Sequence, residues 1–543
     1  VKIDILGNRS LAVIRDALDL VERNTGRRID YADWNPVDDP KTAETFFRGD
    51  TFGVFYFESP ATRQTLKKVG FGFTLEEYLN LDHFLLNVVV TSIIRPASNQ
   101  SIRTWVARLH GEPWDAPHPL LRPVLEETLG IMVFQEQLSQ AAIHMAGFDP
   151  GEADTLRKVV SKKHREKKLR DFHARFVQGA CERGVSGDVV EEVWQMMMGF
   201  DGYSFCKPHS ASYTLVAYKS AYLRAHYPAE FMASVISNGG GYYSTFGYLS
   251  EARRMGLHIL APDINESEIK YTGREKEIRV GLMQLKDLPR EALEFVIHER
   301  GKHGPFTGFE DLLSRTSGHL HLQDVRVLIK AGCLDSIAQG RSRASLLWQA
   351  LRFFDTPAPS VSLNLFESTQ RSSPGGRGWG RGNLRGGSSG ERTFSPLWER
   401  GDRGDFNPPP YSKTLLLKHE WETLGFPLSI HPLDRYRHVL KDLDYVRAMD
   451  LPRHVGRWVT TVGWMVTGKT VHTREGDEMK FVSFEDTTGI YEAVLFPRIY
   501  HKCCHMLNGM RPFLLKGKVE EDFGSLSLTV QRVEFLDRHQ GDP

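Results

Sequence analysis

Residues 202–233 read GYSFCKPHSASYTLVAYKSAYLRAHYPAEFMA, and this stretch carries both a structural and a chemical signal. Apolar residues keep helical spacing from Ser212 to His226, so a helix is predicted there. Lys207 and His209 stand just before it, and Tyr213 stands at its start. Lysine and histidine can neutralise phosphate charge, and an aromatic ring can stack on a base or sugar. The alternative is that these are ordinary structural residues of a core.

The chain on either side of this stretch is mainly helical as far as about residue 235. A helix is predicted from Ser10, and Asn24 to Gly26 end it. Later segments with the same apolar spacing predict helices at 122–129, 136–145, 152–160, 189–198, 290–299 and 322–330. Short strands are predicted at 1–6, 257–262 and 277–280.

The composition changes near the C-terminal third. Residues 371–410 are rich in Gly, Arg, Ser and Pro and have too few apolar residues to bury a core, which predicts a disordered linker. Beyond the linker come five β-rich runs, at 458–464, 479–485, 490–495, 511–519 and 526–535. Five short strands are typical of an oligonucleotide-binding barrel. The predicted fold class is therefore a multidomain, mainly α-helical protein that ends in a β-barrel.

Composition excludes some classes of protein. A chain of 543 residues is expected to form several domains. Its net charge of +1 neither suggests nor excludes nucleic-acid binding. The five cysteines include no C-x-x-C pair, so neither a zinc site nor a disulfide framework is predicted. No membrane span and no secretory leader are visible, and we expect a cytoplasmic protein. Because the first residue is Val1 within a strand-like run, the chain is expected to begin inside a domain.

Seven segments, in this order, resemble the alpha subunit of bacterial DNA polymerase III, a family C DNA polymerase. They are VKIDILGNRSLAVIRDAL (1–18), IIRPAS (93–98), GIMVFQEQL (130–138), EADTLRKVVSKK (152–163), residues 202–233, GLHILAPDIN (256–265) and ETLGFPLSIHPL (422–433). The resemblance implies six parts: a last palm strand (1–9), fingers (10–250), a helix-hairpin-helix and clamp-binding region (251–358), a clamp-binding peptide (359–368), the linker (369–412) and an OB-fold domain (413–543).

The resemblance makes Asp4 the third of three catalytic carboxylates that hold two Mg²⁺ ions for phosphoryl transfer. The intact parent would be a DNA-directed DNA polymerase that needs no organic cofactor. The other two carboxylates form an Asp-x-Asp pair that should lie before Val1, as should the phosphoesterase-like domain and the thumb. We therefore expect this chain alone to be inactive, since one carboxylate cannot build a two-metal site.

The resemblance places phosphate-binding residues in the fingers. Residues 157–175 hold nine Lys and Arg against two acids, an excess that attracts phosphate, although a charge run is more often a solvated helix face. Lys162 and Lys163 are the favoured contacts, and Arg95 is another candidate. Ala97-Ser98 follow Arg95-Pro96 where the family has Gly-Pro, so the turn there is expected to differ.

Lys207, His209 and Tyr213 are implied to contact the incoming deoxynucleoside triphosphate (dNTP). Pro208 stands where the family has serine, which removes a hydroxyl but keeps the lysine and the histidine. For Gln135 and Glu136, packing and ligand contact remain equal alternatives.

Residues 278–300 correspond to the family's helix-hairpin-helix, which grips the DNA backbone through glycine amides. This chain has KDLPR at 286–290 instead of a glycine-rich hairpin, so Lys286 and Arg290 are candidates to hold duplex DNA by charge. A purely structural hairpin is the alternative.

Residues 362–366, SLNLF, resemble the family's sliding-clamp peptide, in which Leu363, Leu365 and Phe366 would enter an apolar groove. Ser362 replaces the usual glutamine, which should weaken binding. A short apolar patch at a domain end is the alternative.

In the barrel, Trp464, Lys480 and Phe481 are candidates for binding template single strand, although barrel aromatics are also ordinary core residues. The family also implies the clamp loader as a partner. Since the chain stops soon after the barrel, a shorter accessory or error-prone relative is expected, with truncation as the alternative.

Two functions follow. The first is part of a polymerase that binds primer–template DNA and dNTP in replication or translesion synthesis. The second is a non-catalytic DNA- and sliding-clamp-binding accessory protein. What precedes Val1 discriminates between them.

Overall fold

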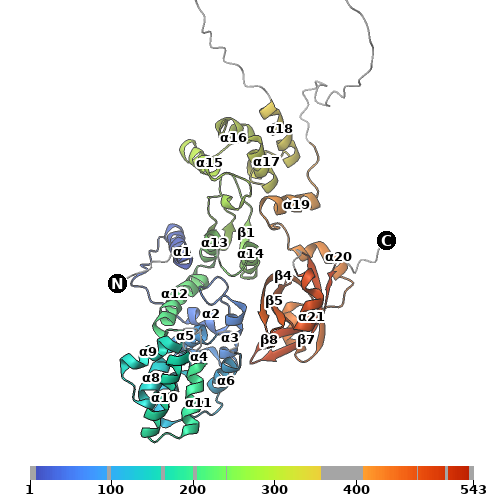
Figure 1. Ribbon diagram of the computed structural model, residues 1–543. Helices are drawn as coiled ribbons and strands as arrows, with labels where there is room; N and C mark the ends of the chain where they lie inside the picture. The colour runs from blue at the N-terminus through green and yellow to red at the C-terminus, as the bar shows by residue number, and fades with distance from the viewer. Residues whose placement is uncertain are drawn as a thin grey trace, which may run out of the picture. The chain divides into compact units, whose positions relative to one another are not determined.

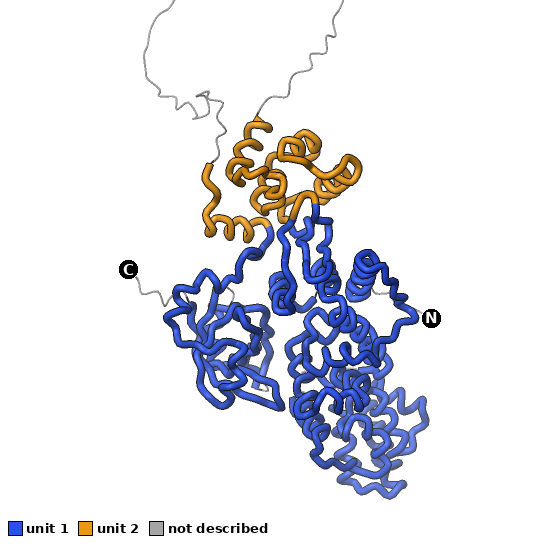
Figure 2. The backbone as a smooth tube through the Cα atoms, turned by 180° about the vertical axis from the view of Figure 1, so that it is seen from behind, with its two compact units in different colours: residues 1–262, 266–284, 424–543 blue, residues 263–265, 285–423 orange. Residues whose placement is uncertain are grey.

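The computed structural model describes residues 8–94, 99–160, 166–199, 205–239, 241–355, 408–473, 475–507 and 511–536. The predicted strand 1–6 and almost all of the predicted linker lie outside these ranges. The chain forms two compact units, drawn in different colours in Figure 2. Unit 1 comprises residues 1–262, 266–284 and 424–543, and unit 2 comprises residues 263–265 and 285–423.

The first part of unit 1 is helical, as predicted (Figure 1). Helix α1 begins after Asn8, whose side chain accepts a hydrogen bond from the Ser10 amide, and ends at Gly26 in the left-handed region. The helices are α1 (Arg9–Thr25), α2 (Pro40–Phe47), α3 (Pro60–Gly70), α4 (Leu75–Asn80), α5 (His83–Ile93), α6 (Asn99–Leu109), α7 (Arg122–Leu125), α8 (Gln135–Ala146), α9 (Pro150–Val160), α10 (Glu166–Glu182), α11 (Gly187–Met198), α12 (Lys207–His226), α13 (Pro228–Asn238) and α14 (Thr245–Arg254).

Helix α12 organises one of the two helical cores. It packs against α2, α5 and α13, and buries Ala217, Tyr218 and Ala221 in a cluster shared with α2 and α5. It begins at Lys207, five residues before the predicted start, because Pro208 is tolerated in a first turn where no amide partner is needed. The early start places the predicted ligand-binding residues on the helix itself.

The second helical core lies within α8, α9, α10 and α11. Its centre holds Leu138, Phe176 and Trp194, and α10 packs against α8 and α9. Gly179 on α10 permits this contact, because a Cβ atom there would lie 2.1 Å from the carbonyl oxygen of Ala146.

Residues 458–535 of unit 1 form the predicted five-stranded barrel, which confirms the predicted fold class. The strands are β4 (Trp458–His472), β5 (Glu478–Glu485), β6 (Ile490–Leu495), β7 (Pro512–Asp522) and β8 (Ser525–Phe535), closed in the order β4-β5-β6-β8-β7. Pairs are antiparallel except β6 with β8. Alternate residues such as Val482, Phe484 and Leu515 fill the interior. Three short elements flank the strands: η7 (Ala448–His454), α20 (Arg437–Leu440) and α21 (Pro497–Cys503).

A small sheet stands between the helices and the barrel in the sequence of unit 1. Two of its strands were predicted, β1 (His258–Leu260) and β3 (Glu277–Arg279), and they pair in parallel. The third, β2 (Thr272–Arg274), pairs antiparallel with β3 and was not predicted.

Unit 2 contains five helices among its described residues, α15 (Arg290–His303), α16 (Phe309–Arg315), α17 (Leu322–Ala331), α18 (Arg343–Asp355) and α19 (Lys413–Thr423). Helix α17 packs against both α18 and α19. The Lys330 ammonium lies 2.9 Å from the Glu422 carboxylate, and the Ser342 hydroxyl donates to the carbonyl of Pro408. The chain therefore returns to unit 2 after residue 407 before it enters the barrel.

No helix in the described ranges is long and apolar enough to cross a membrane.

A network of buried charges lies in unit 1. The guanidinium of Arg224 (7% exposed) lies 2.6 Å from the carboxylate of Glu251. Arg254 bridges Glu251 to Glu485, a barrel residue with no exposed side-chain surface. Burial of Glu251 acts to raise its pKa, but the charges of Arg224 and Arg254 outweigh burial and lower the pKa to about 2.

We predict a corresponding loss of stability in acid. The pKa of Glu251 is lower in the folded protein than the ordinary 4.5, so its contribution is complete above pH 4.5 and is lost as the pH falls toward 2. The loss should be on the order of 3 kcal/mol. Thermal unfolding midpoints measured across this range should fall more steeply for the wild type than for Glu251→Gln. Parallel profiles would contradict the prediction.

Candidate nucleic-acid interface

The start of α12 holds three predicted ligand-binding residues, but not on one face. Lys207 points toward Glu127, with 2.5 Å between the ammonium and the carboxylate, and it is 37% exposed. Its ammonium also lies 5.7 Å from the ring centre of Phe134. His209 is exposed, and its ring centre lies 4.1 Å from that of Tyr213. Because residues two apart on a helix face different ways, Lys207 and His209 cannot act on one atom without rearrangement.

Two aromatic residues that the sequence did not indicate join Tyr213. The ring centres of Phe55 and Tyr56 lie 5.1 Å and 5.5 Å from that of Tyr213. We call Phe55, Tyr56, His209 and Tyr213 the aromatic platform. Sequence periodicity carries no signal for it, because Phe55 and Tyr56 belong to the connection between α2 and α3.

Gln135 and Glu136 have partners within the protein near the N-terminus of α12. The Glu136 carboxylate accepts a hydrogen bond from the Lys207 backbone N–H at 3.0 Å. The Gln135 side-chain oxygen accepts one from Arg157. Glu136 therefore caps α12, where a carboxylate also favours the positive end of the helix dipole.

The basic run is partly neutralised by two carboxylates of α9. Arg157 and Lys158 both contact Asp154, at 2.7 Å and 2.6 Å, and Arg175 contacts Glu152. The charge available for phosphate is therefore smaller than the composition of residues 157–175 suggests.

Several predicted site residues lie outside the described residues. They are Asp4, Arg95, Lys162, Lys163, Leu363, Leu365 and Phe366. Within the described residues, no three His, Cys, Asp or Glu side chains group as metal ligands.

The predicted duplex-binding residues lie in unit 2, before and at the start of α15. Lys286 donates its backbone N–H to the carbonyl of Thr423 at 2.8 Å. Asp287 has a φ of +60°, which provides the left-handed turn that glycine would usually make. The Arg290 guanidinium is 81% exposed and lies 2.6 Å from Glu294.

The barrel separates its three predicted residues. Trp464 is 9% exposed and belongs to the barrel wall, so its ring is not offered to solvent. Phe481 is 40% exposed, and it pairs across β4 and β5 with Lys469. The neighbouring Lys480 ammonium lies 6.0 Å from the ring centre of Tyr500. An exposed ring beside cations is the arrangement that binds single strands.

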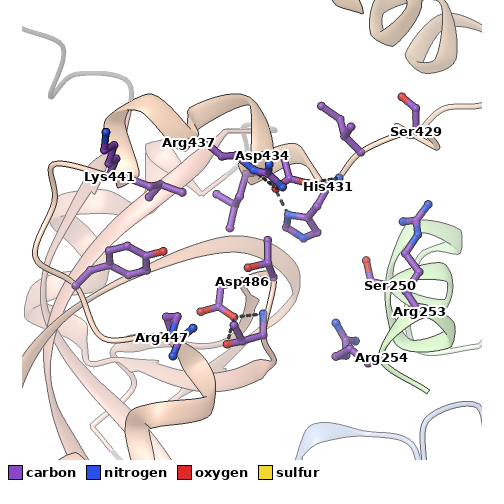
Figure 3. Close-up of a pocket in the computed structure, with 16 residues that line it drawn as sticks. Ser250, Arg253, Arg254, Ser429, His431, Asp434, Arg437, Lys441, Arg447 and Asp486 are labelled. Carbon is purple, nitrogen blue, oxygen red and sulfur yellow. Dashed lines mark hydrogen bonds and ion pairs between the residues drawn. The ribbon is translucent and has the colours of Figure 1, made fainter. Parts of the chain in front are cut away.

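Figure 3 shows a pocket of about 730 Å³ within unit 1, between α14 and the start of the barrel domain. Three of the five Lys and Arg residues that line it have acidic partners: Arg437 lies 2.8 Å from Asp434, Arg447 lies 3.0 Å from Asp450, and Arg254 lies 3.0 Å from Glu485. Asp486 accepts hydrogen bonds from backbone amides, including that of Ala448. Its charges are therefore largely balanced within the protein.

Comparison with known families agrees with this architecture. Residues 10–184 match the finger domain of the bacterial DNA polymerase III alpha subunit, and residues 256–345 match a helix-hairpin-helix motif. These matches give a polymerase finger region followed along the chain by a helix-hairpin-helix motif.

Curated relatives extend the match to nearly the whole chain. The DNA polymerase III alpha subunit of Thermus aquaticus is 33% identical over 96% of this chain and 40% of its own length. Those of Aquifex aeolicus (31%) and Staphylococcus aureus strain MSSA476 (30%) match 98% of the chain and 42% and 46% of their own lengths. This chain belongs to the bacterial DNA polymerase III alpha subunit family, and it spans less than half the length of these relatives.

Proposed function

We propose that this chain is part of a DNA-directed DNA polymerase that binds primer–template DNA and the incoming dNTP in replication or translesion synthesis in the bacterial cytoplasm. The observation that carries the proposal is the match to polymerase III alpha subunits over almost the entire chain. The charged and aromatic residues at the start of α12 and on the barrel support it.

In this proposal the chain contributes binding and one catalytic ligand. Asp4 would be one carboxylate ligand of Mg²⁺ in the intact parent, where the metal ions activate the primer oxygen and neutralise pyrophosphate charge. Arg95, Lys162, Lys163 and Lys207 would bind phosphate, and Lys286 and Arg290 would hold the duplex. We propose that the chain alone has no polymerase activity, because Asp4 is the one family carboxylate we assign in it. Nucleotide incorporation by the purified chain would refute this point.

The barrel provides a direct test of single-strand binding. We predict that Lys480→Ala with Phe481→Ala weakens binding of a fluorescein-labelled oligothymidylate about tenfold, because a cation and a stacking ring are lost. Fluorescence anisotropy at several salt concentrations should also show a shallower salt dependence, since one phosphate contact is removed.

The matched control replaces a cation and an exposed apolar residue elsewhere in unit 1. Arg453 is 82% and Met449 is 60% exposed on η7. Arg453→Ala with Met449→Ala should leave binding unchanged. Equal binding by the wild type and both double variants would show that Lys480 and Phe481 do not bind single strands. Absence of DNA binding by the wild type would contradict the proposed function.

We also propose that Leu363, Leu365 and Phe366 bind the sliding clamp, with the clamp loader as a further partner. Leu365→Ala with Phe366→Ala should reduce the affinity for a purified clamp at least tenfold, because two of the three side chains that would enter an apolar groove are removed. Surface plasmon resonance with Asn364→Ala as the control measures this. An unchanged affinity would show that the peptide is not the site.

A further inference from the structure

Tyr56 has an unusual backbone conformation for a residue whose side chain is partly open to solvent. Its φ is +65°, a region in which a bulky side chain is strained. Leu129 and Phe523 also have positive φ, but their side chains pack against the core that α12 organises. The Tyr56 side chain is instead 38% exposed. Tyr56 therefore combines a strained backbone with a ring that is partly open to solvent.

Several side chains fix the turn that contains Tyr56. The buried Thr51 hydroxyl donates to the carbonyl of Phe57 at 2.7 Å, which closes the turn across Tyr56. Arg224 donates to the carbonyls of Asp50, at 2.6 Å, and Phe52, at 3.2 Å. A strained residue persists when its neighbours over-determine its conformation, and such residues cluster at ligand sites. These hydrogen bonds therefore hold the backbone on both sides of Tyr56.

The same helix that anchors this turn supplies the ring beside Tyr56. Tyr213 and Arg224 lie about three turns apart on α12, and so on one side of it. Tyr213 contacts Tyr56 at a ring-centre distance of 5.5 Å and an interplanar angle of 73°. An edge-on neighbour supports the Tyr56 ring while leaving ring surface exposed. The platform is thus both preorganised and open.

We propose that Tyr56 is a nucleobase-binding residue, whose exposed ring stacks on a base while Tyr213 supports it. This inference rests on the proposed function. It assigns the base of the ligand to the aromatic platform, because the Lys207 ammonium cannot recognise a base. The ligand chemistry is a planar base, which can belong to an incoming nucleotide or to an unpaired nucleotide of a strand. Stacking accepts any base, because every base offers a π face.

The test uses a variant that separates ligand binding from folding. Tyr56→Gly removes the ring and also the backbone strain, so the thermal unfolding midpoint should stay the same or rise. Ligand binding should fall on the order of tenfold. Tyr56→Phe keeps the ring and should bind as the wild type does. A residue with a purely structural role would lower the unfolding midpoint on replacement, and that result would overturn the proposal.

Phe523→Gly is the matched control, because Phe523 also has a positive φ (+47°) but its ring stacks on that of His110. This variant should unfold at a lower temperature. At temperatures where it is still folded, it should bind dATP and oligothymidylate as the wild type does.

Two probes distinguish the source of the base, and both are applied to the full chain. One is dATP, followed by tyrosine fluorescence quenching, and the other is a fluorescein-labelled oligothymidylate. Weaker dATP binding by Tyr56→Gly assigns the base of the incoming nucleotide, and weaker oligonucleotide binding assigns a strand base.

Normal binding of both probes by Tyr56→Gly, with weaker dATP binding by Lys207→Gln, would overturn the proposal that Tyr56 binds a nucleobase. The proposed function would still stand. Failure of the wild type to bind either probe would overturn both.

Discussion

The Arg224→Met variant is expected to lose about 3–5 kcal/mol of unfolding free energy, one of the two largest effects predicted for this chain. Methionine keeps the length of the side chain but leaves the Glu251 carboxylate with one partner fewer in a buried site. It also leaves the carbonyls of Asp50 and Phe52 without their donor. A buried charge that loses its partner is costly because water cannot replace the contact. Urea denaturation followed by circular dichroism measures the loss.

Arg48→Met is the control in the same unit. Arg48 is 62% exposed and pairs with Glu44 one helical turn away, so its removal should cost less than about 0.5 kcal/mol. Equal losses for the two variants would show that the Arg224 network contributes no more than a surface pair does.

Gly179→Ala is expected to cause the second large loss, about 3 kcal/mol. The added Cβ would overlap the Ala146 carbonyl oxygen, and backbone atoms cannot move aside as a side-chain end can. Helices α8 and α10 would have to separate, which opens the core around Phe176. Hydrogen–deuterium exchange should show faster exchange in α8 and α10 and little change in the barrel.

Gly187→Ala is the matched control, since nothing lies within 4 Å of the Cβ it would add at the start of α11. Its stability should stay the same or rise by up to about 1 kcal/mol. A similar loss in both variants would mean that the contact of α10 with α8 does not set the cost, because alanine by itself favours a helix over glycine.

The sequence predicted helices and strands well where burial of one face requires a regular spacing of apolar residues. Four of the five barrel strands lie within three residues of their predicted bounds, because alternate residues such as Val482 and Phe484 must face the interior. Strand β4 is the exception, since it continues eight residues beyond its predicted end at Trp464. Strand β2 escaped prediction because Thr272–Arg274 is too short to show alternation and has Gly273 at its centre. Helix α12 was predicted from Ser212 and begins five residues earlier, at Lys207, with Pro208 in its first turn.

The candidate site was predictable in its chemistry and not in its arrangement. Residue type and motif indicated Lys207, His209 and Tyr213. Nothing near Lys207 in the sequence indicated that Glu127, eighty residues earlier, would be its partner. Tyr56 could not be predicted either, because a positive φ at a tyrosine follows from tertiary contacts and has no local sequence signal. Alternation along β4 could not decide whether Trp464 faces solvent, and the structure buries it.

The return of the chain to unit 2 after residue 407 changes what the segment 356–407 connects. Helices α18 and α19 flank it and both pack against α17, so both of its ends are fixed to the same unit. In topological terms it is an insertion within one unit rather than a tether between two. Its length could therefore change during evolution without altering the covalent distance from unit 2 to the barrel, which is set by the residues around Thr423 and Leu424.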